Sequence, residues 1–349
     1  MKTRSSLRVA MLAPISWRTP PREYGPWELA TSVLTEGLAA RGVDVTLFAT
    51  LDSVTRAKLR GVAPHGYSEP PLLDAKVYEC LHIANVYEHA GEFDIIHNHF
   101  DFLPLTYSRL VATPTVTTIH GITPSTLPVF HQYNDHAFYV SISNAHRIPG
   151  LQYSATVYHG IDMRLFTFQS EPGAYLLYFA RMHPEKGAKE AIAVAKRTGL
   201  PLIMAGPVHD EVYFEQEVLP HVDGTSVLYV GNAGPEERNR LLGGARALLH
   251  LISVEEPFGL SVPEAMACGT PVIAFRRGSM AELIEHGTTG FVADTLDEAV
   301  AAVGKLSTVH RQACRERVEK NFTAENMVDG YLEVYERILQ QPQKKTHAH

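Results

Sequence analysis

The residues with the clearest chemical potential lie between Ser253 and Phe275, in the segment SVEEPFGLSVPEAMACGTPVIAF. Glu256 and Glu264 stand eight positions apart there, and two prolines and a glycine between them prevent a single helix from holding both. We therefore expect Glu256 in a loop and Glu264 in the first turn of a helix. A loop that leads into a helix N-terminus offers N–H groups to a phosphate, and carboxylates beside it can hold hydroxyls. The segment thus indicates a nucleotide-sugar site.

Glu264 has a competing local role. The residues Ser261–Glu264 (SVPE) fit a capping box, in which the serine caps the helix and the glutamate reaches back to its N-terminus. The proline in this stretch agrees with a helix start. From this pattern alone we expect Glu264 to cap the helix rather than to bind ribose. Glu256 has no such local partner, although acidic loops are mostly solvated.

Two cations stand in the segment ARMHPEKG, between a predicted strand and a predicted helix. Arg181 could bind a diphosphate with its planar fork, and Lys186 could do so as a point charge. Both would stabilise the charge that grows on a leaving nucleoside diphosphate. A solvated turn with two surface cations explains the spacing equally well, but the strand-turn-helix context and Gly187 favour the functional interpretation.

Histidines follow two other predicted strands. His120 ends the strand TVTTI and precedes a glycine, so it is a candidate for a ligand-binding cleft. His97 and His99 form an H-x-H pair that would bind a metal only with a third ligand, for which Asp101 is available. We expect a packing or loop-ordering role for this pair more than a metal site.

The bulk composition describes a two-domain protein of ordinary globular character. The chain has 349 residues, of which 45% are hydrophobic and 20% charged, and its net charge of −7 argues against a nucleic-acid partner. Its three cysteines are widely separated and fit neither a disulfide framework nor a zinc site. The N-terminal apolar run is too short for a signal peptide, and no segment approaches a membrane span. A reducing cytoplasm is the expected location.

Short apolar runs alternate with helical patterns, which predicts parallel sheets with crossover helices. The expected strands are residues 7–13, 43–49, 94–97, 115–119, 138–142, 156–158, 175–180, 202–205, 226–230, 247–251, 271–274 and 290–292. The expected helices include residues 27–41, 72–90, 144–148 and 188–198, with further helices near 300–320 and 324–340. The polar segment Thr167–Gly173 is expected to be the hinge between two doubly wound domains.

The loop after the first predicted strand is a further candidate for ligand contact. It reaches the first helix through Gly25 and Pro26, and it lacks the G-x-G-x-x-G pattern of a nicotinamide dinucleotide site. An ordinary helix entry with Pro26 in the first turn explains the same residues. The sequence also lacks a nucleophilic serine elbow, a P-loop lysine motif and a D-x-D pair for a metal-bound diphosphate.

The chain resembles the retaining glycosyltransferases of family 4 over nearly its whole length. The resemblance rests on EPFGLSVPEAMACGTPVIAFRRGSMAELIEHGTTGFV, with support from ARMHPEKG, TIHG and VYHGID. It implies the GT-B fold, an α/β arrangement of two doubly wound Rossmann-like domains that face a cleft. The implied divisions are 1–166 for an acceptor-binding domain, 167–325 for a nucleotide-sugar-binding domain, 326–340 for a helix that crosses back to the first domain, and 341–349 for a disordered tail.

The resemblance also implies a role for each matching residue. The expected catalytic residues are His120, beside the donor sugar, and Glu256, Arg181 and Lys186. Glu264 would bind the ribose diol. The expected donor-binding residues are Gly25, Arg181, Lys186, Gly206, Asn232, Glu256, Phe258, Gly259, Leu260, Ser261 and Glu264. The family often has a second glycine where this chain has Pro26, which removes an N–H and weakens a phosphate contact at Gly25, and His159 replaces the more usual asparagine.

The implied reaction is sugar transfer from a nucleoside-diphosphate sugar to a hydroxyl acceptor, with retention by a front-face route. A UDP-sugar is slightly favoured over a GDP-sugar, and no cofactor or obligatory divalent metal is expected. The one basic cluster, Arg56, Lys58 and Arg60, is small, so we expect a soluble small-molecule or saccharide acceptor and weak membrane association at most. The protein is expected to be a monomer or homodimer.

Two other functions fit the same pattern. One is a nucleotide-sugar epimerase of the same architecture, which would need no acceptor. The other is a non-catalytic two-domain protein that binds a sugar or nucleotide.

Overall fold

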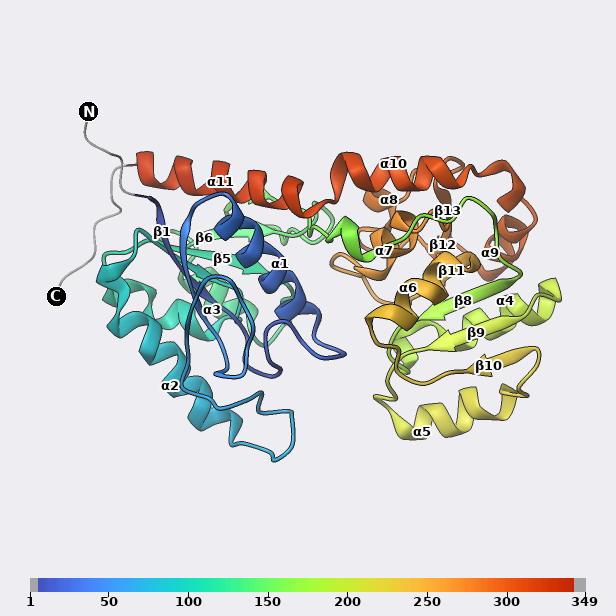
Figure 1. Cartoon of the computed structure of the whole chain (residues 1–349), viewed down its shortest axis with the longest axis horizontal. Coiled ribbons are helices and arrows are strands. Elements are labelled where there is room, and N and C mark those ends of the chain that lie inside the picture. The colour runs from blue at the N-terminus through green and yellow to red at the C-terminus, as the bar shows by residue number, and fades with distance from the viewer. Residues whose placement is uncertain (1–5, 342–349) are drawn as a thin grey trace. The chain divides into compact units, whose positions relative to one another are not determined.

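The computed structural model describes residues 6–341, which form two compact units (Figure 1). Unit 1 ends at Gly160 and resumes at Ala324, whereas unit 2 spans Ile161–Thr323. The first division falls ahead of the predicted boundary at 166/167, and the second lies close to the one at 325/326. Of the predicted tail 341–349, only residue 341 lies within the described part of the chain.

The segment that was expected to be the hinge is bound into unit 2. The Thr167 amide donates to Asn239 Oδ1 at 2.9 Å, and the Gln169 amide donates to the Cys268 carbonyl at 3.0 Å. The chain instead passes between the units at Gly160–Ile161, where Ile161 pairs with Thr323 in an isolated parallel bridge. The segment 167–173 thus lies within unit 2, after the division between the units.

Unit 1 contains a seven-stranded parallel sheet in the order β3-β2-β1-β4-β5-β6-β7. Its strands are β1 Arg8–Leu12, β2 Asp44–Phe48, β3 Lys58–Arg60, β4 Ile95–Asn98, β5 Thr115–Ile119, β6 Phe138–Ser141 and β7 Tyr153–Thr156. Its α-helices are α1 Pro26–Ala40, α2 Ala75–Glu88, α3 Leu127–Gln132 and α11 Ala324–Gln340.

Both faces of the unit 1 sheet are covered, which explains its nearly continuous apolar strands. Val9 and Met11 of β1 pack on one face with side chains of α1 and α11, which lie beside each other (Figure 1). Ala10 and Leu12 point to the opposite face and pack with α2. The period of two along the strand thus divides β1 between two hydrophobic layers.

Unit 2 contains a six-stranded parallel sheet in the order β10-β9-β8-β11-β12-β13. Its strands are β8 Tyr175–Phe179, β9 Leu202–Ala205, β10 Val227–Tyr229, β11 Ala245–His250, β12 Val272–Phe275 and β13 Gly290–Ala293. Its α-helices are α4 Ala188–Thr198, α5 Glu211–Tyr213, α6 Pro235–Gly243, α7 Ser261–Ala267, α8 Met280–Leu283, α9 Leu296–Val303 and α10 Arg311–Asn321.

The fold class predicted from the sequence, two doubly wound Rossmann-like α/β domains, is confirmed, but some local predictions were wrong. Residues 144–148 form turns rather than a helix, because Asn144 Oδ1 accepts from Thr156 and the Ser143 hydroxyl accepts the His146 amide. The strand expected at 156–158 is β7, which ends at Thr156. The helical pattern near 300–320 is divided between α9 and α10, and the short edge strand β3 was not foreseen.

Candidate functional site

The central strands of unit 2 bring the predicted cations and the first glutamate to one edge of the sheet. β8 and β11 are neighbours, and the strand order reverses between them because β9 follows β8 on one side and β12 follows β11 on the other. Arg181 comes just after β8, and Glu256 comes after β11. Ligands of open α/β sheets bind beyond the carboxyl ends of strands at such a reversal.

Two glycines allow backbone segments to approach each other closely at this edge of the sheet. A Cβ at Gly187, where φ is +75°, would lie 2.0 Å from the Leu251 carbonyl oxygen. A Cβ at Gly206, where φ is +141°, would lie 2.0 Å from the Ala180 carbonyl oxygen. Only glycine accommodates both the torsion angle and the contact. Gly206 therefore supports the backbone beside Arg181, and Gly187 holds the turn that carries Lys186.

Lys186 and Glu256 form a close ion pair. Lys186 Nζ lies 2.6 Å from Glu256 Oε2, and the two side chains are only 16% and 14% exposed. His250, the last residue of β11, places its Nε2 3.9 Å from the same carboxylate oxygen. His250 was not among the residues predicted from the sequence, although it shares with His120 the position at the end of a buried strand.

Opposing effects act on the pKa of Glu256. Burial raises it, but Lys186, His250 and Arg181 together outweigh burial, so the pKa lies below its ordinary value. Burial lowers the pKa of His250 to about 4, and this ring is neutral near pH 7. The site thus holds an ionised carboxylate beside a cation and a neutral imidazole.

Arg181 contributes a donor that has no acceptor. Its Nε is buried and makes no hydrogen bond to the residues that the structure describes. Leaving a buried N–H unpaired costs about 1–3 kcal/mol, more for a charged group. An anion that reached this guanidinium would remove that cost.

Glu264 does not cap its helix, so the capping-box expectation was wrong. Helix α7 begins at Ser261 with no side-chain cap, and Glu264 Oε1 lies 3.2 Å from Nη1 of Arg238 on α6. Both side chains are largely buried, and burial raises the pKa of Glu264 although Arg238 opposes it. Arg238 also covers the ring of Phe166, at 5.5 Å from its centroid. A local sequence pattern could not reveal this pairing.

The loop between the two glutamates is held by the segment after β12. Ser279 donates its amide to the Glu256 carbonyl at 3.0 Å and its hydroxyl to the Phe258 carbonyl at 2.7 Å. Gly278 packs so closely that a Cβ would lie 2.1 Å from the Glu256 carbonyl oxygen. Gly278 and Ser279 were not among the predicted site residues.

The remaining predicted donor-binding residues lie at the same loops. Gly259 has φ +83°, and a Cβ there would meet Glu256 and His250 at 3.3 Å. The Phe258 ring is buried and packs edge-on against Phe322, so its side chain anchors the loop. Leu260 immediately precedes α7 and Ser261 begins it. Asn232 follows β10 in the segment whose Gly231 carbonyl accepts the Gly206 amide at 2.8 Å.

In unit 1 the predicted histidine is buried among other rings. His120 follows β5 and stacks with Trp27 and with His159, with centroid distances of 5.1 Å to each. Its Nε2 lies 3.1 Å from His99 Nδ1. Burial, together with neighbouring histidines, holds the pKa of His120 well below its ordinary value. His120 is thus neutral near pH 7.

The H-x-H pair packs against hydroxyl groups and other rings. Among residues 6–341, no group of three or more His, Cys, Asp or Glu side chains is arranged to hold a metal ion. His97 Nδ1 lies 2.5 Å from the Tyr335 hydroxyl, and its Nε2 lies 2.8 Å from Thr118 Oγ1. His97 thus has the packing role that was expected.

The entry to α1 is already occupied by a carboxylate. Gly25 precedes the helix with φ +153°, and a Cβ there would lie 2.8 Å from Pro21. Glu28 in the first turn is buried and accepts the Trp17 amide at 3.3 Å, and burial raises its pKa to about 7. A carboxylate here weakens the predicted phosphate contact at Gly25.

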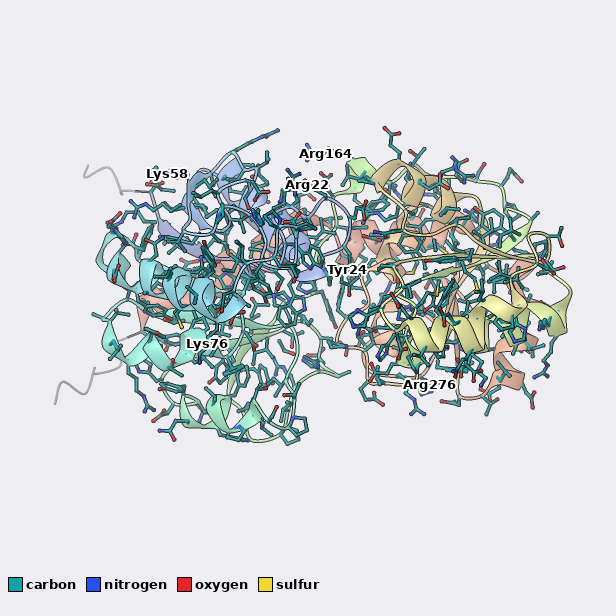
Figure 2. All side chains as sticks on the ribbon, turned by 90° about the horizontal axis from the view of Figure 1, so that it is seen from below. Arg22, Tyr24, Lys58, Lys76, Arg164 and Arg276 are labelled. Carbon is teal, nitrogen blue, oxygen red and sulfur yellow. The ribbon has the colours of Figure 1, made fainter. Side chains whose placement is uncertain are left out.

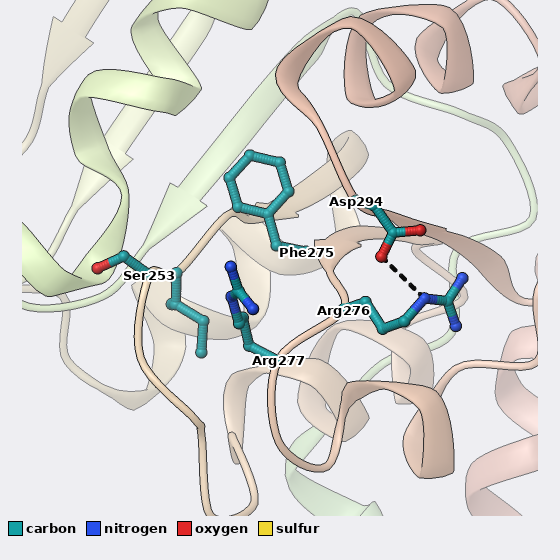
Figure 3. A pocket seen from close by; sticks show the side chains of 6 residues that line it. Ser253, Phe275, Arg276, Arg277 and Asp294 are labelled. Carbon is teal, nitrogen blue, oxygen red and sulfur yellow. Dashed lines mark hydrogen bonds and ion pairs between the residues drawn. The ribbon is translucent and has the colours of Figure 1, made fainter.

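A pocket of about 270 Å³ lies at the carboxyl ends of β11, β12 and β13 (Figure 3). Arg276 points toward Asp294, at 3.0 Å, and Arg277 points toward the space between Ser253 and Phe275. Arg277 also approaches Glu255 at 3.9 Å. Each arginine therefore has a nearby carboxylate.

The small basic cluster of unit 1 is likewise neutralised. Lys58 pairs with Asp44 at 2.7 Å, and Arg60 pairs with Glu92 at 2.7 Å. Lys58 extends outward from the ribbon (Figure 2). No helix within residues 6–341 is both long enough and apolar enough to cross a bilayer.

Known proteins match both units. Residues 166–323 match the family described as glycosyl transferases group 1, and residues 30–151 match glycosyltransferase family 4. The chain belongs to these glycosyltransferases. The two matched stretches contain Arg181, Lys186, Glu256 and Glu264 in unit 2, and His120 in unit 1.

Individual relatives agree with this membership. Glycogen synthase of Mycobacterium tuberculosis is 29% identical over 217 residues, which are 56% of this chain and about half (52%) of that enzyme. Sucrose-phosphate synthase from Thermosynechococcus elongatus has a similar fold, with a TM-score of 0.78, 18% identity and coverage of 95% and 99% of the two chains. The Anabaena protein HepE in complex with UDP and glucose has a TM-score of 0.74 at 17% identity, with coverage of 95% and 100%.

Proposed function

We propose that this protein is a retaining glycosyltransferase that moves a sugar from a nucleoside-diphosphate sugar to a hydroxyl of a small-molecule or saccharide acceptor. Family membership supports sugar transfer. The observation that carries the donor assignment is the buried, unpaired Nε of Arg181 beside the Lys186–Glu256 pair at the end of β8 and β11. This arrangement suits a diphosphate next to a group with hydroxyls.

Each residue has a defined part in the proposed donor complex. Arg181 and Lys186 bind the diphosphate, and Glu256 accepts hydrogen bonds from hydroxyls of the sugar. Glu264 binds the ribose diol, and its short contact with Arg238 fixes the carboxylate. His120 contacts the sugar near the anomeric carbon.

The proposed reaction follows a front-face route. The bond between the anomeric carbon and the diphosphate oxygen breaks, and the acceptor oxygen forms its bond to that carbon on the same face. The acceptor proton passes to the departing phosphate oxygen, so no protein base is needed. Glu256 is held by Lys186, which suits the binding of hydroxyls better than attack on carbon. Arg181 and Lys186 stabilise the charge on the leaving diphosphate.

UDP is the first nucleotide to test. The proposed reaction requires no divalent metal. HepE, which has a similar fold, was crystallised with UDP and glucose. Two cations replace the charge that a metal would supply. The paired state of Lys58 and Arg60 supports a small-molecule or saccharide acceptor over a membrane lipid.

The test is incubation with UDP- and GDP-sugars, in EDTA, with a panel of hydroxyl acceptors. The expected result is release of the nucleoside diphosphate together with a new glycoside whose anomeric configuration, read by NMR, matches that of the donor. Inversion would overturn the mechanism. An altered sugar nucleotide formed without any acceptor would favour the epimerase alternative, and binding without turnover would favour a non-catalytic protein.

A further inference from the structure

Four buried histidines of unit 1 form a continuous row of rings, of which the proposed function uses only one. The centroids of His97 and His99 are 4.2 Å apart, those of His99 and His120 5.2 Å, and those of His120 and His159 5.1 Å. None is more than 6% exposed. Burial lowers the pKa of each, so all four rings are neutral near pH 7.

A neutral imidazole has one N–H donor and one acceptor nitrogen, so a hydrogen bond between two such rings fixes the state of both. The contact between His99 Nδ1 and His120 Nε2, at 3.1 Å, is of this kind. If one ring donates, the other must accept. The outer nitrogens, His99 Nε2 and His120 Nδ1, then take complementary states.

The surroundings of His120 leave one polar edge for a ligand. Trp27 and His159 both stack on the ring, with interplanar angles of 19° and 25°. His99 occupies Nε2. Nδ1 is buried and has no hydrogen-bond partner among the described residues. Nδ1 is therefore the ring nitrogen that remains for a hydrogen bond to a ligand.

We propose that His99 is a positioning residue that fixes the tautomer of His120, so that His120 presents Nδ1 to the donor sugar as an acceptor. The Nε2–H form is the intrinsically favoured tautomer of neutral histidine. Only one arrangement gives both rings this form, namely donation from His120 Nε2–H to His99 Nδ1. His120 Nδ1 then carries a lone pair, which accepts a sugar hydroxyl or faces the positive charge that develops at the anomeric carbon. The sugar contact rests on the proposed function, whereas the hydrogen bond between the two histidines does not.

The rest of the row supports His99 by packing. His97 lies against the His99 ring and is fixed at both nitrogens, by Tyr335 of α11 and by Thr118 of β5. Thr118 Oγ1 also contacts the Tyr331 hydroxyl at 2.6 Å. Helix α11 thus stabilises a ring that in turn orients the pair.

The test combines nitrogen NMR of the imidazoles with kinetics. His99→Asn keeps an amide oxygen near the position of Nδ1 that can accept from His120, whereas His99→Leu keeps the approximate volume without an acceptor. His82→Leu is the matched control, because His82 is also buried in unit 1 and its ring bonds to the Ala13 carbonyl at 2.9 Å rather than to another histidine. The His120 signals are assigned from their loss in His120→Gln.

In the wild type, and in His99→Asn and His82→Leu, we expect His120 to carry its proton on Nε2. In His99→Leu the proton should move partly or wholly to Nδ1, and kcat should fall about tenfold or more while the KM for the donor changes less. His99→Asn should recover most of the lost kcat.

A His120 that carries its proton on Nδ1 in the wild type, or an unchanged tautomer in His99→Leu, would overturn the proposal. If the tautomers behave as expected but no nucleotide sugar is turned over by the wild type, the histidine pair stands and the proposed function fails.

Discussion

Unit 1 and unit 2 share a parallel α/β architecture, but they bury different kinds of polar group. Unit 1 buries neutral rings: His97 and His99 pack beside tyrosines of α11, and His120 stacks with Trp27. Unit 2 buries charges, in the pairs Lys186–Glu256 and Arg238–Glu264. The same topology therefore supports two chemistries, and among residues 6–341 the Lys/Arg–carboxylate pairs with both side chains largely buried lie in unit 2.

The largest effect on stability should follow from breaking the most buried ion pair of unit 2. Arg238→Met leaves the Glu264 carboxylate buried without its cation, and removal of one partner of such a pair costs about 3–5 kcal/mol. The free energy of unfolding, measured by urea denaturation, should fall by this amount. The double variant Arg238→Met/Glu264→Met should recover much of the loss. A single variant as stable as the wild type would show that the pair is not buried in solution.

The largest effect on turnover should follow from the diphosphate cations. Arg181→Ala and Lys186→Ala should each lower kcat about 10²–10³-fold, as removal of other preorganised electrostatic groups does. Lys189→Ala is the matched control, since Lys189 lies in the same region but is 61% exposed and pairs with Glu217. Steady-state kinetics with the active donor would measure these changes. Wild-type rates in both variants would refute the assignment.

The neutral histidines of unit 1 predict that the free energy of unfolding decreases at acidic pH. The ordinary pKa of histidine is 6.5, and burial lowers that of His97 and of His159 to about 3. Between these values the unfolded chain binds protons that the folded protein does not, so stability is fully present above pH 6.5 and decreases as the pH falls. Each such histidine should cost about 1.4 kcal/mol per pH unit within that window.

Unit 1 can be followed separately because both tryptophans, Trp17 and Trp27, belong to it. Urea unfolding is monitored by tryptophan fluorescence at pH 7 and at pH 5. The free energy of unfolding of the wild type should be much lower at pH 5. The loss should be about 2 kcal/mol smaller in His97→Gln, which lacks one titrating group over 1.5 pH units. Equal losses in the two proteins would mean that His97 is not held neutral.

The smallest effect on stability and on nucleotide binding should come from a substitution in the pocket of Figure 3. Arg276 and Asp294 are both more than half exposed, so Arg276→Ala should change the free energy of unfolding by less than about 1 kcal/mol. Binding of the donor nucleotide should stay within about twofold of wild type. A larger loss of binding would extend the donor site to this pocket.

Much of the unit 2 site could be predicted from the sequence because parallel strands end at the same edge of a sheet. Lys186 and Glu256 are 70 residues apart, yet each follows a strand, and the fold brings them together. The Arg238–Glu264 pair could not be predicted, because the SVPE pattern offered a local partner while the true one lies on another helix. Local patterns describe helix ends well only when tertiary burial does not compete.

The histidine row was partly foreseeable for the same reason. His97 lies in β4, His99 follows that strand, and His120 follows the adjacent strand β5. The tyrosines that fix His97 come from α11, more than 200 residues later. Nothing in the periodicity of α11 distinguishes these tyrosines from other core residues. The failed helix at 144–148 has a related cause, since its polar side chains bond to neighbouring loop residues instead.

The most direct test asks whether a nucleoside diphosphate binds at the buried charges of unit 2. It measures thermal stabilisation by UDP, GDP, ADP and dTDP in EDTA. The wild type is compared with Arg181→Ala and Lys189→Ala. At about 100 times its Kd a bound nucleotide adds roughly 2.7 kcal/mol, which shifts a melting curve clearly. One diphosphate should stabilise the wild type and Lys189→Ala but not Arg181→Ala. The unliganded melting temperature of Arg181→Ala should equal or exceed that of the wild type, because the variant lacks the unpaired buried donor. Failure of every diphosphate to stabilise the wild type, or equal stabilisation of Arg181→Ala, would contradict a donor site built on the charges of unit 2.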